Sequence, residues 1–141
     1  MRFMILVKAT ADSEAGKPPS PALLAVMMKY NQELAEAGVL LAAEGLHPSA
    51  KGARIAFSGA TRTVVDGPFD DIAGLVAGFW LFQVQSKDEA IQWVKRCPNP
   101  FDGPCEIEIR QVFAAEDFGS ELTPELKAAE TRLRMRLATT A

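Results

Sequence analysis

Acid–base chemistry is the first function that the residue types of this sequence suggest. His47 is the only histidine among the 141 residues, and it follows a predicted strand whose end carries Glu44. An imidazole exchanges protons near neutral pH, and a carboxylate beside it fixes its tautomer and stabilises its charged form. We therefore name His47, Asp66 as its orienting partner and Glu44 as a further base as candidate catalytic residues.

Each of these three residues also has a structural interpretation. His47 can be an ordinary histidine of a surface loop, because the sequence does not give its distance from Asp66. Asp66 opens the stretch DGPF, where its carboxylate can cap a turn while the Gly-Pro pair redirects the chain. Glu44 can form a simple ion pair with Arg54 or Arg62. The sequence leaves both interpretations open.

A second group of charged residues lies toward the C-terminal end of the predicted domain. Glu108 and Arg110 alternate with Ile107 and Ile109, so one face of this strand meets the core and the other meets water or a polar cavity. In a cavity, Arg110 can bind a carboxylate through two N–H groups. We name Arg110, Glu108 and, from the DGPF turn, Phe69 as candidate substrate-binding residues. A solvated strand face and a core anchor are the alternatives.

The composition argues against several classes of function. A net charge of −3 and a pI near 5.2 give no broad attraction to nucleic acid or to anionic membranes, so neither partner is expected. No glycine-rich phosphate loop appears, and Cys97 and Cys105 with one histidine make no tetrahedral zinc site without carboxylates. We expect reduced cysteines, no cofactor and no metal. No apolar run approaches the ~18 residues that span a bilayer, and we expect a cytoplasmic protein.

The elements that must position these residues follow from caps and from the spacing of apolar residues. Helices are predicted to begin after the capping residues Ser20, Ser86 and Thr123, and the first two end at Gly38 and Pro98. Strands are predicted at residues 1–8, 39–43, 54–57, 61–65, 79–84 and 105–110.

The order of these elements predicts the fold. Without the hairpin and the last helix it is strand, helix, strand, strand, helix, strand, the split βαβ arrangement of ferredoxin-like α+β proteins. We predict such a domain over residues 1–113, with an extra β-hairpin, and a linker and helix extension over residues 114–141. The segment FWLF at 79–82 has large apolar side chains on both faces of its strand. A second copy is therefore expected to cover the open face of the sheet in a homodimer.

Several stretches, taken in order, resemble one known family. They are MRFMILVK at the start, LAEAGVLLAAEGLHPS at 34–49, VVDGPF at 64–69, GFWLFQVQSKDEAIQWVKRCP at 78–98 and EIEIRQV at 106–112. Together they are far more specific than DGPF alone. They resemble the YCII-related family, in its DGPF-type branch, up to about Phe113, and the resemblance implies a dimeric α+β barrel.

The resemblance implies less about the reaction. The broader family is proposed to carry a His-Asp pair in its cleft, and its fold is similar to that of small isomerases, monooxygenases and a dehydrochlorinase. Genes of the DGPF branch often neighbour those of extracytoplasmic-function sigma factors. Where the family pattern has a histidine in the first helix, this sequence reads MKYN at 28–31, so the pair is not carried over there.

Two hypotheses follow. In the first, the protein is a small cofactor-independent isomerase or lyase that acts on a small acid in a dimer cavity, with Asp66 and His47 moving protons and Arg110 binding the anion. In the second, it is a non-catalytic ligand-binding or regulatory protein with a protein partner, linked to a sigma-factor system. The first requires a concave site with converging polar groups, and the second predicts a flat exposed face of mixed charge.

Overall fold

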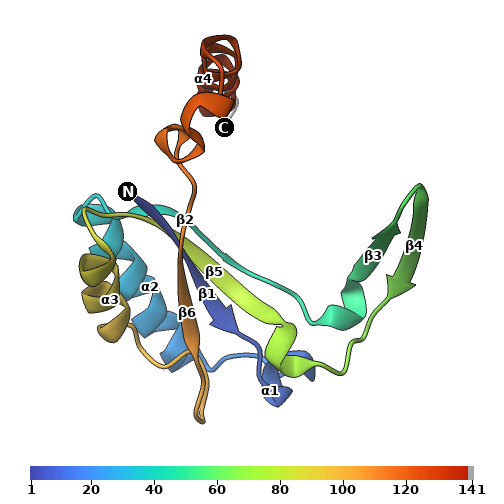
Figure 1. Ribbon diagram of the computed structural model, residues 1–141. Helices are drawn as coiled ribbons and strands as arrows, with labels where there is room; N and C mark the ends of the chain where they lie inside the picture. The colour runs from blue at the N-terminus through green and yellow to red at the C-terminus, as the bar shows by residue number, and fades with distance from the viewer. Residues whose placement is uncertain (140–141) are drawn as a thin grey trace. The chain divides into compact units, whose positions relative to one another are not determined.

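An antiparallel sheet of four strands forms the centre of the fold in the computed structural model, which describes residues 1–139. The strands are β1 (Arg2–Lys8), β2 (Leu40–Gly45), β5 (Val76–Gln83) and β6 (Ile107–Gln111). Their order across the sheet is β2-β5-β1-β6 (Figure 1). This order, with every neighbouring pair antiparallel, is the predicted split βαβ topology.

Two helices, α2 (Pro21–Glu36) and α3 (Lys87–Lys95), cover one face of this sheet (Figure 1). Both begin where the sequence predicts, because the hydroxyls of Ser20 and Ser86 each accept a backbone N–H of the first turn at 3.1 Å. Gly38 follows α2 with a φ of 74°, a left-handed conformation in which glycine ends helices at little steric cost.

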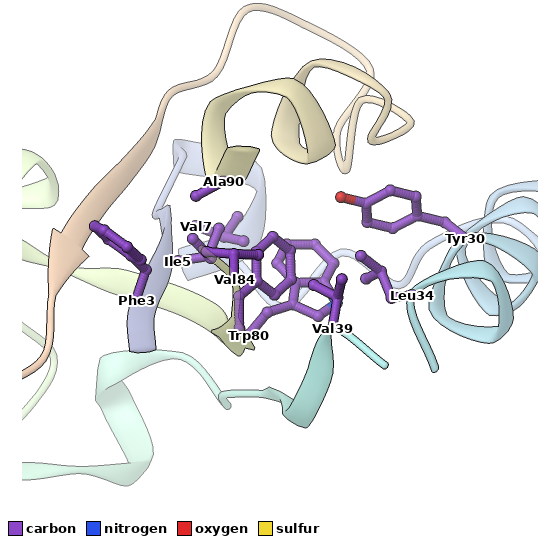
Figure 2. Packing of buried hydrophobic residues seen from close by; sticks show 10 residues of the cluster. Phe3, Ile5, Val7, Tyr30, Leu34, Val39, Trp80, Val84 and Ala90 are labelled. Atoms are coloured by element: carbon purple, nitrogen blue, oxygen red, sulfur yellow. The ribbon is translucent and has the colours of Figure 1, made fainter. Parts of the chain in front are cut away.

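The core lies between the sheet and these helices (Figure 2). Its buried apolar residues are Phe3, Ile5, Val7, Tyr30, Leu34, Val39, Trp80, Phe82, Val84 and Ala90. Alternate residues of β1 and β5 supply much of this set, as the strand period of two requires. Tyr30 stands edge-on to Trp80 with ring centroids 5.8 Å apart, and its hydroxyl donates to the carbonyl of Trp93 at 2.7 Å.

Neither α2 nor α3 lies on the other face of the sheet (Figure 1). Pairing between β1 and β5 brings Met4 opposite Leu81 and Leu6 opposite Phe79 on this open face, and all four side chains are only half-buried. Continuing the pairing onto β6 places Glu108 and Arg110 on the same face. The predicted homodimer, in which a second copy covers this surface, stays a prediction.

The predicted hairpin forms a separate two-stranded sheet of β3 (Ala53–Ser58) and β4 (Thr61–Asp66). Gly59 makes its turn with a φ of 58°. Every residue of both strands is exposed, and Phe57 keeps 72% of its surface accessible. An isolated two-stranded ribbon is marginally stable in water, so this hairpin depends on what holds its ends.

Sequence reasoning missed a short helix, α1 (Ala11–Glu14), in the connector after β1. It begins with a reciprocal cap, because Thr10 Oγ1 accepts the N–H of Ser13 at 3.1 Å and Ser13 Oγ accepts the N–H of Thr10 at 2.9 Å. The expected strand from Cys105 begins two residues later, at Ile107. The Cys105 thiol is tied instead to Asn99 Oδ1 of the preceding loop, at 3.3 Å.

The chain from Val112 onward forms a second unit that we describe by itself. It contains the 3-10 segment η3 (Ala115–Glu121) and the helix α4 (Pro124–Thr139). The helix begins at the predicted cap, because Thr123 Oγ1 accepts the N–H of Leu126 at 3.2 Å. None of the described α4 residues is buried. Within residues 1–139, no helix is long and apolar enough to cross a membrane.

Candidate functional site

A pocket of about 580 Å³ opens beside the first half of α2, where β1 and β2 end and β5 begins. This volume is within the range of sites that bind small organic molecules. Large apolar side chains dominate its lining, among them Leu23, Leu24, Met27, Trp80 and Phe101. The pocket lies on the helix side of the sheet, because Met27 and Trp80 belong to or pack against the core.

A polar contact links the two walls of the pocket. The indole N–H of Trp80 donates to Asn31 Oδ1 at 2.8 Å, so the amide NH₂ group of Asn31 is the donor that this side chain retains. Asn31 lies in α2, within the stretch where the family pattern has a histidine. The helix therefore supplies the pocket with a neutral hydrogen-bonding group.

His47 and Glu44 also line the pocket, and both residues are exposed. His47 stands at the rim, just beyond the end of β2. Glu44 pairs with Phe79, one position away from the Ala43–Trp80 pair that faces the core. Since successive strand residues point to opposite faces, the Glu44 side chain belongs to the open face. Of the two, His47 is therefore the better candidate to meet a ligand in the pocket.

The predicted ion pair between Glu44 and Arg54 or Arg62 is wrong. Arg54 instead forms a bidentate pair with Asp71, at 2.9 and 3.0 Å, and this pair holds the pKa of the Asp71 carboxyl below its usual value. Arg62 donates to backbone carbonyls of its own turn and lies over the Phe57 ring. Both arginines therefore serve the hairpin and its ends.

Lys17 contributes a positive charge to the pocket lining, and two nearby aspartates compensate that charge. Its ammonium lies 3.3 Å from Asp102 and 3.7 Å from Asp12. The hydrogen bond to Asp102, with the charges of both aspartates, raises the pKa of Lys17. These groups are exposed, so the pairs contribute little to stability. They do remove the net positive charge that a carboxylate ligand would need.

The loop after His47 is fastened by Ser49, in the 3-10 segment η1 (Ser49–Lys51). Ser49 donates its backbone N–H to both carboxylate oxygens of Glu14 at 3.1 Å and its hydroxyl to one of them at 2.7 Å. The same hydroxyl accepts the N–H of Phe69 at 3.0 Å. Three segments that are distant in sequence thus meet at one serine.

The DGPF stretch packs directly against this serine. Gly67 donates its N–H to the carbonyl of Gly52 at 3.0 Å, and a Cβ at Gly67 would overlap the carbonyl oxygen of Ser49. The Asp66 side chain makes no hydrogen bond within residues 1–139, and Asp66 is exposed at the end of β4. The Asx-type turn that the sequence offered as an alternative is therefore not formed, and no hydrogen bond joins Asp66 to His47.

The three candidate substrate-binding residues lie outside the pocket lining. Phe69 is half-buried, with the guanidinium of Arg54 over its ring at 4.0 Å, and it does not join the core. Arg110 pairs with Glu108 at 3.2 Å on the open face. These two residues could bind a ligand only in a cavity on that face, such as the one expected between two copies of the chain.

Glu14, Ser49 and Asn31 are the polar site residues that sequence reasoning missed. The T-x-x-S pattern at Thr10 could have indicated the cap that precedes Glu14. The apolar residues of the pocket could not be distinguished from core residues in the sequence, because the pocket residues of α2 follow the same periodicity as core residues.

Cys97 and Cys105 are both free thiols, as predicted. Burial, with a smaller contribution from nearby Cys105, raises the pKa of Cys97 to about 12, so this thiol is protonated and unreactive at neutral pH. Within residues 1–139, no cluster of three histidine, cysteine or acidic residues has the geometry of a metal site.

Comparison with known proteins places this geometry in context. A model of the YCII-related domain family matches residues 1–115. No curated protein matches the chain. A similar solved structure is that of 5-chloro-2-hydroxyhydroquinone dehydrochlorinase from Burkholderia phenoliruptrix in complex with 2,5-dihydroxybenzoquinone. It has 16% sequence identity and a TM-score of 0.44, covering 83% of this chain and 98% of that chain.

Proposed function

Because the chain belongs to the YCII-related domain family, we propose that its pocket binds a small, weakly acidic organic molecule and that His47 exchanges protons with it. The protein would then be a cofactor-independent isomerase or lyase. The observation that carries this proposal is the apolar pocket of about 580 Å³ with one imidazole at its rim.

The charges at the pocket favour a ligand that enters without a full negative charge. Among the described lining residues, Lys17 is neutralised by two aspartates. A carboxylate would leave water without gaining a free cation, which is costly. A phenol or an enol suits the pocket better, because its ring packs on Trp80 and its hydroxyl can pair with Asn31 or His47.

In this proposal, His47 takes a proton from the bound molecule and gives it back at another position. An isomerase returns the proton to a different atom of the same molecule, whereas a lyase passes it to the departing group. His47 accepts no hydrogen bond and donates none within residues 1–139, so its imidazole is available to a ligand.

Deuterium exchange tests both binding and chemistry. Phenols and enolisable ketones, with benzoate as the carboxylate comparison, would be incubated with the protein in D₂O, and incorporation of deuterium into carbon positions followed by NMR. We expect exchange that falls by about 10²- to 10⁴-fold in His47→Gln and is unchanged in Lys29→Gln, an exposed α2 variant. Exchange that survives in His47→Gln would refute the role of His47.

A non-catalytic regulatory protein is the second candidate, and the exposed hairpin favours it. Both strands present apolar side chains to solvent, and the segments that hold the hairpin, at Ser49 and Gly67, adjoin the His47 loop. A ligand at the rim could therefore alter the surface that a protein partner meets. Tight binding of a phenol probe with no exchange or turnover across the panel would favour this candidate.

A further inference from the structure

We propose that Glu14 and Ser49 are positioning residues that hold the His47 loop at the pocket rim, with the DGPF turn as the fixed support behind them. This proposal rests on the proposed role of His47. It assigns a function to α1 and to the glycine of DGPF, which the acid–base chemistry itself does not use.

Glu14 is well placed to act as a fixed anchor. The reciprocal cap between Thr10 and Ser13 holds the single turn of α1, so the backbone of Glu14 does not depend on the loop that it binds. Its carboxylate then accepts the N–H of Ser49 at 3.1 Å and the Ser49 hydroxyl at 2.7 Å. Charge-assisted hydrogen bonds of this kind are about twice as strong as neutral ones.

Ser49 transmits this anchor to the DGPF turn. Its hydroxyl has one proton to donate, which goes to Glu14, and it accepts the N–H of Phe69 at 3.0 Å. Gly67 lies against the Ser49 carbonyl so closely that any side chain there would displace it. The serine is thus held on two sides, by a carboxylate and by the backbone of the turn.

The His47 segment has few other restraints. Leu46 donates its N–H to the carbonyl of Ala77 at 2.8 Å, and Pro48 has no N–H to donate. The Pro48 carbonyl accepts the N–H of Lys51 at 3.0 Å, so the backbone around His47 is held by one bond before it, by this turn and by the Ser49 junction two residues after it. Ser13, beside Glu14, also lines the pocket, so the junction joins two segments of the pocket lining.

NMR of the ligand-free protein tests the proposal without any activity. His47 is the only histidine, so its ring Cε1 proton gives a unique signal, and ¹⁵N relaxation reports its backbone order. In Glu14→Gln and Ser49→Ala we expect the ring signal to shift and the order parameter of His47 to fall from about 0.85 to below about 0.6. Ser49→Thr, which keeps the hydroxyl, should restore both values.

Glu33→Gln is the matched control, since Glu33 is a surface carboxylate paired with Arg96 at 3.2 Å on the far half of α2. It should leave the His47 signals unchanged. Glu14→Asp, which keeps the charge but shortens the reach, should give an intermediate loss of order and serves if Glu14→Gln folds poorly. If His47 is as ordered in Glu14→Gln, Glu14→Asp and Ser49→Ala as in the control, the positioning role is overturned. Absence of exchange activity in the wild type would refute the proposed function and leave this result standing.

Discussion

At the scale of single residues, the glycine of DGPF matters more to the described site than the aspartate does. A Cβ at Gly67 would lie 2.6 Å from the carbonyl carbon of Ser49 and 3.3 Å from the nitrogen of Ala50. Both neighbours are backbone atoms, which cannot rotate away as a flexible side chain would. The requirement for glycine is therefore steric, and it concerns the loop that carries His47.

Gly67→Ala should destabilise the protein and disturb the His47 loop. We expect a loss of about 1–3 kcal/mol in the free energy of unfolding, the usual cost of inserting a methyl group where there is no room. Urea unfolding measures the loss. Gly103→Ala is the control, because a Cβ there would meet no atom within 4 Å and the backbone is not left-handed. Equal stability of the two variants would contradict the close approach at Gly67.

The buried thiol of Cys97 predicts a loss of stability in alkali. The pKa of this thiol is about 12 in the folded protein, whereas an ordinary cysteine, as in the unfolded chain, has a pKa of 9.0. Between these two values the unfolded chain binds fewer protons than the folded protein. The free energy of unfolding should fall as pH rises above 9, by less than about 1.4 kcal/mol per pH unit because the thiol is only partly buried and solvent screens it. Tyr30, whose pKa burial also raises, contributes mainly above pH 10.

Urea unfolding between pH 9 and pH 10 checks this thiol. In Cys97→Ala the fall should be reduced, whereas Cys105→Ala should change it less, because the more exposed Cys105 has a smaller upward pKa shift. An alkaline fall of unchanged slope in Cys97→Ala would mean that another group is responsible.

At the scale of elements, the sequence predicted what periodicity and caps encode. The helices α2 and α3 begin directly after the caps Ser20 and Ser86, burial alternates along β1 and β5, and the β2-β5-β1-β6 order follows from the element order. The features that it did not predict are tertiary contacts. Glu14 meets Ser49 across 35 positions, and no local pattern encodes that contact. The pairing proposed for Glu44 was wrong because Arg54 pairs with Asp71, 17 positions away, and Arg62 donates to carbonyls of its own turn.

The two sheets should differ sharply in their sensitivity to one substitution. Ile5→Ala in β1 removes a side chain with 0% exposure from the core and should cost about 2–5 kcal/mol of the free energy of unfolding. Ile55→Ala in β3 removes a side chain that is 57% exposed and should cost less than about 0.5 kcal/mol. Chemical denaturation compares them directly. A loss above about 1 kcal/mol for Ile55→Ala would mean that a further surface covers the hairpin.

At the scale of the whole molecule, we expect a partner on the sheet face opposite α2 and α3. Met4, Leu6, Phe79 and Leu81 form a half-exposed apolar strip on that face, flanked by the Glu108–Arg110 pair. The core accounts for only one of the two apolar faces of β5. A second copy offers the same strip in return, and a twofold axis would bring like surfaces together with charged residues around them.

Leu81→Lys should therefore convert a dimer into a monomer. In light scattering at micromolar concentration, the wild type is expected at twice the 15.3 kDa of the chain, and the variant at one chain mass. In a dimer of the variant, each of the two introduced lysines would be buried against the other subunit without an opposite charge, at a cost of several kcal/mol. Met135→Lys, on the exposed α4 helix, is the control and should stay dimeric. Because Leu81 is half-buried already, circular dichroism must show the variant folded. A monomeric wild type would refute the dimer. A dimeric, folded Leu81→Lys would move the interface away from the sheet, and the exposed hairpin would become the surface to substitute next.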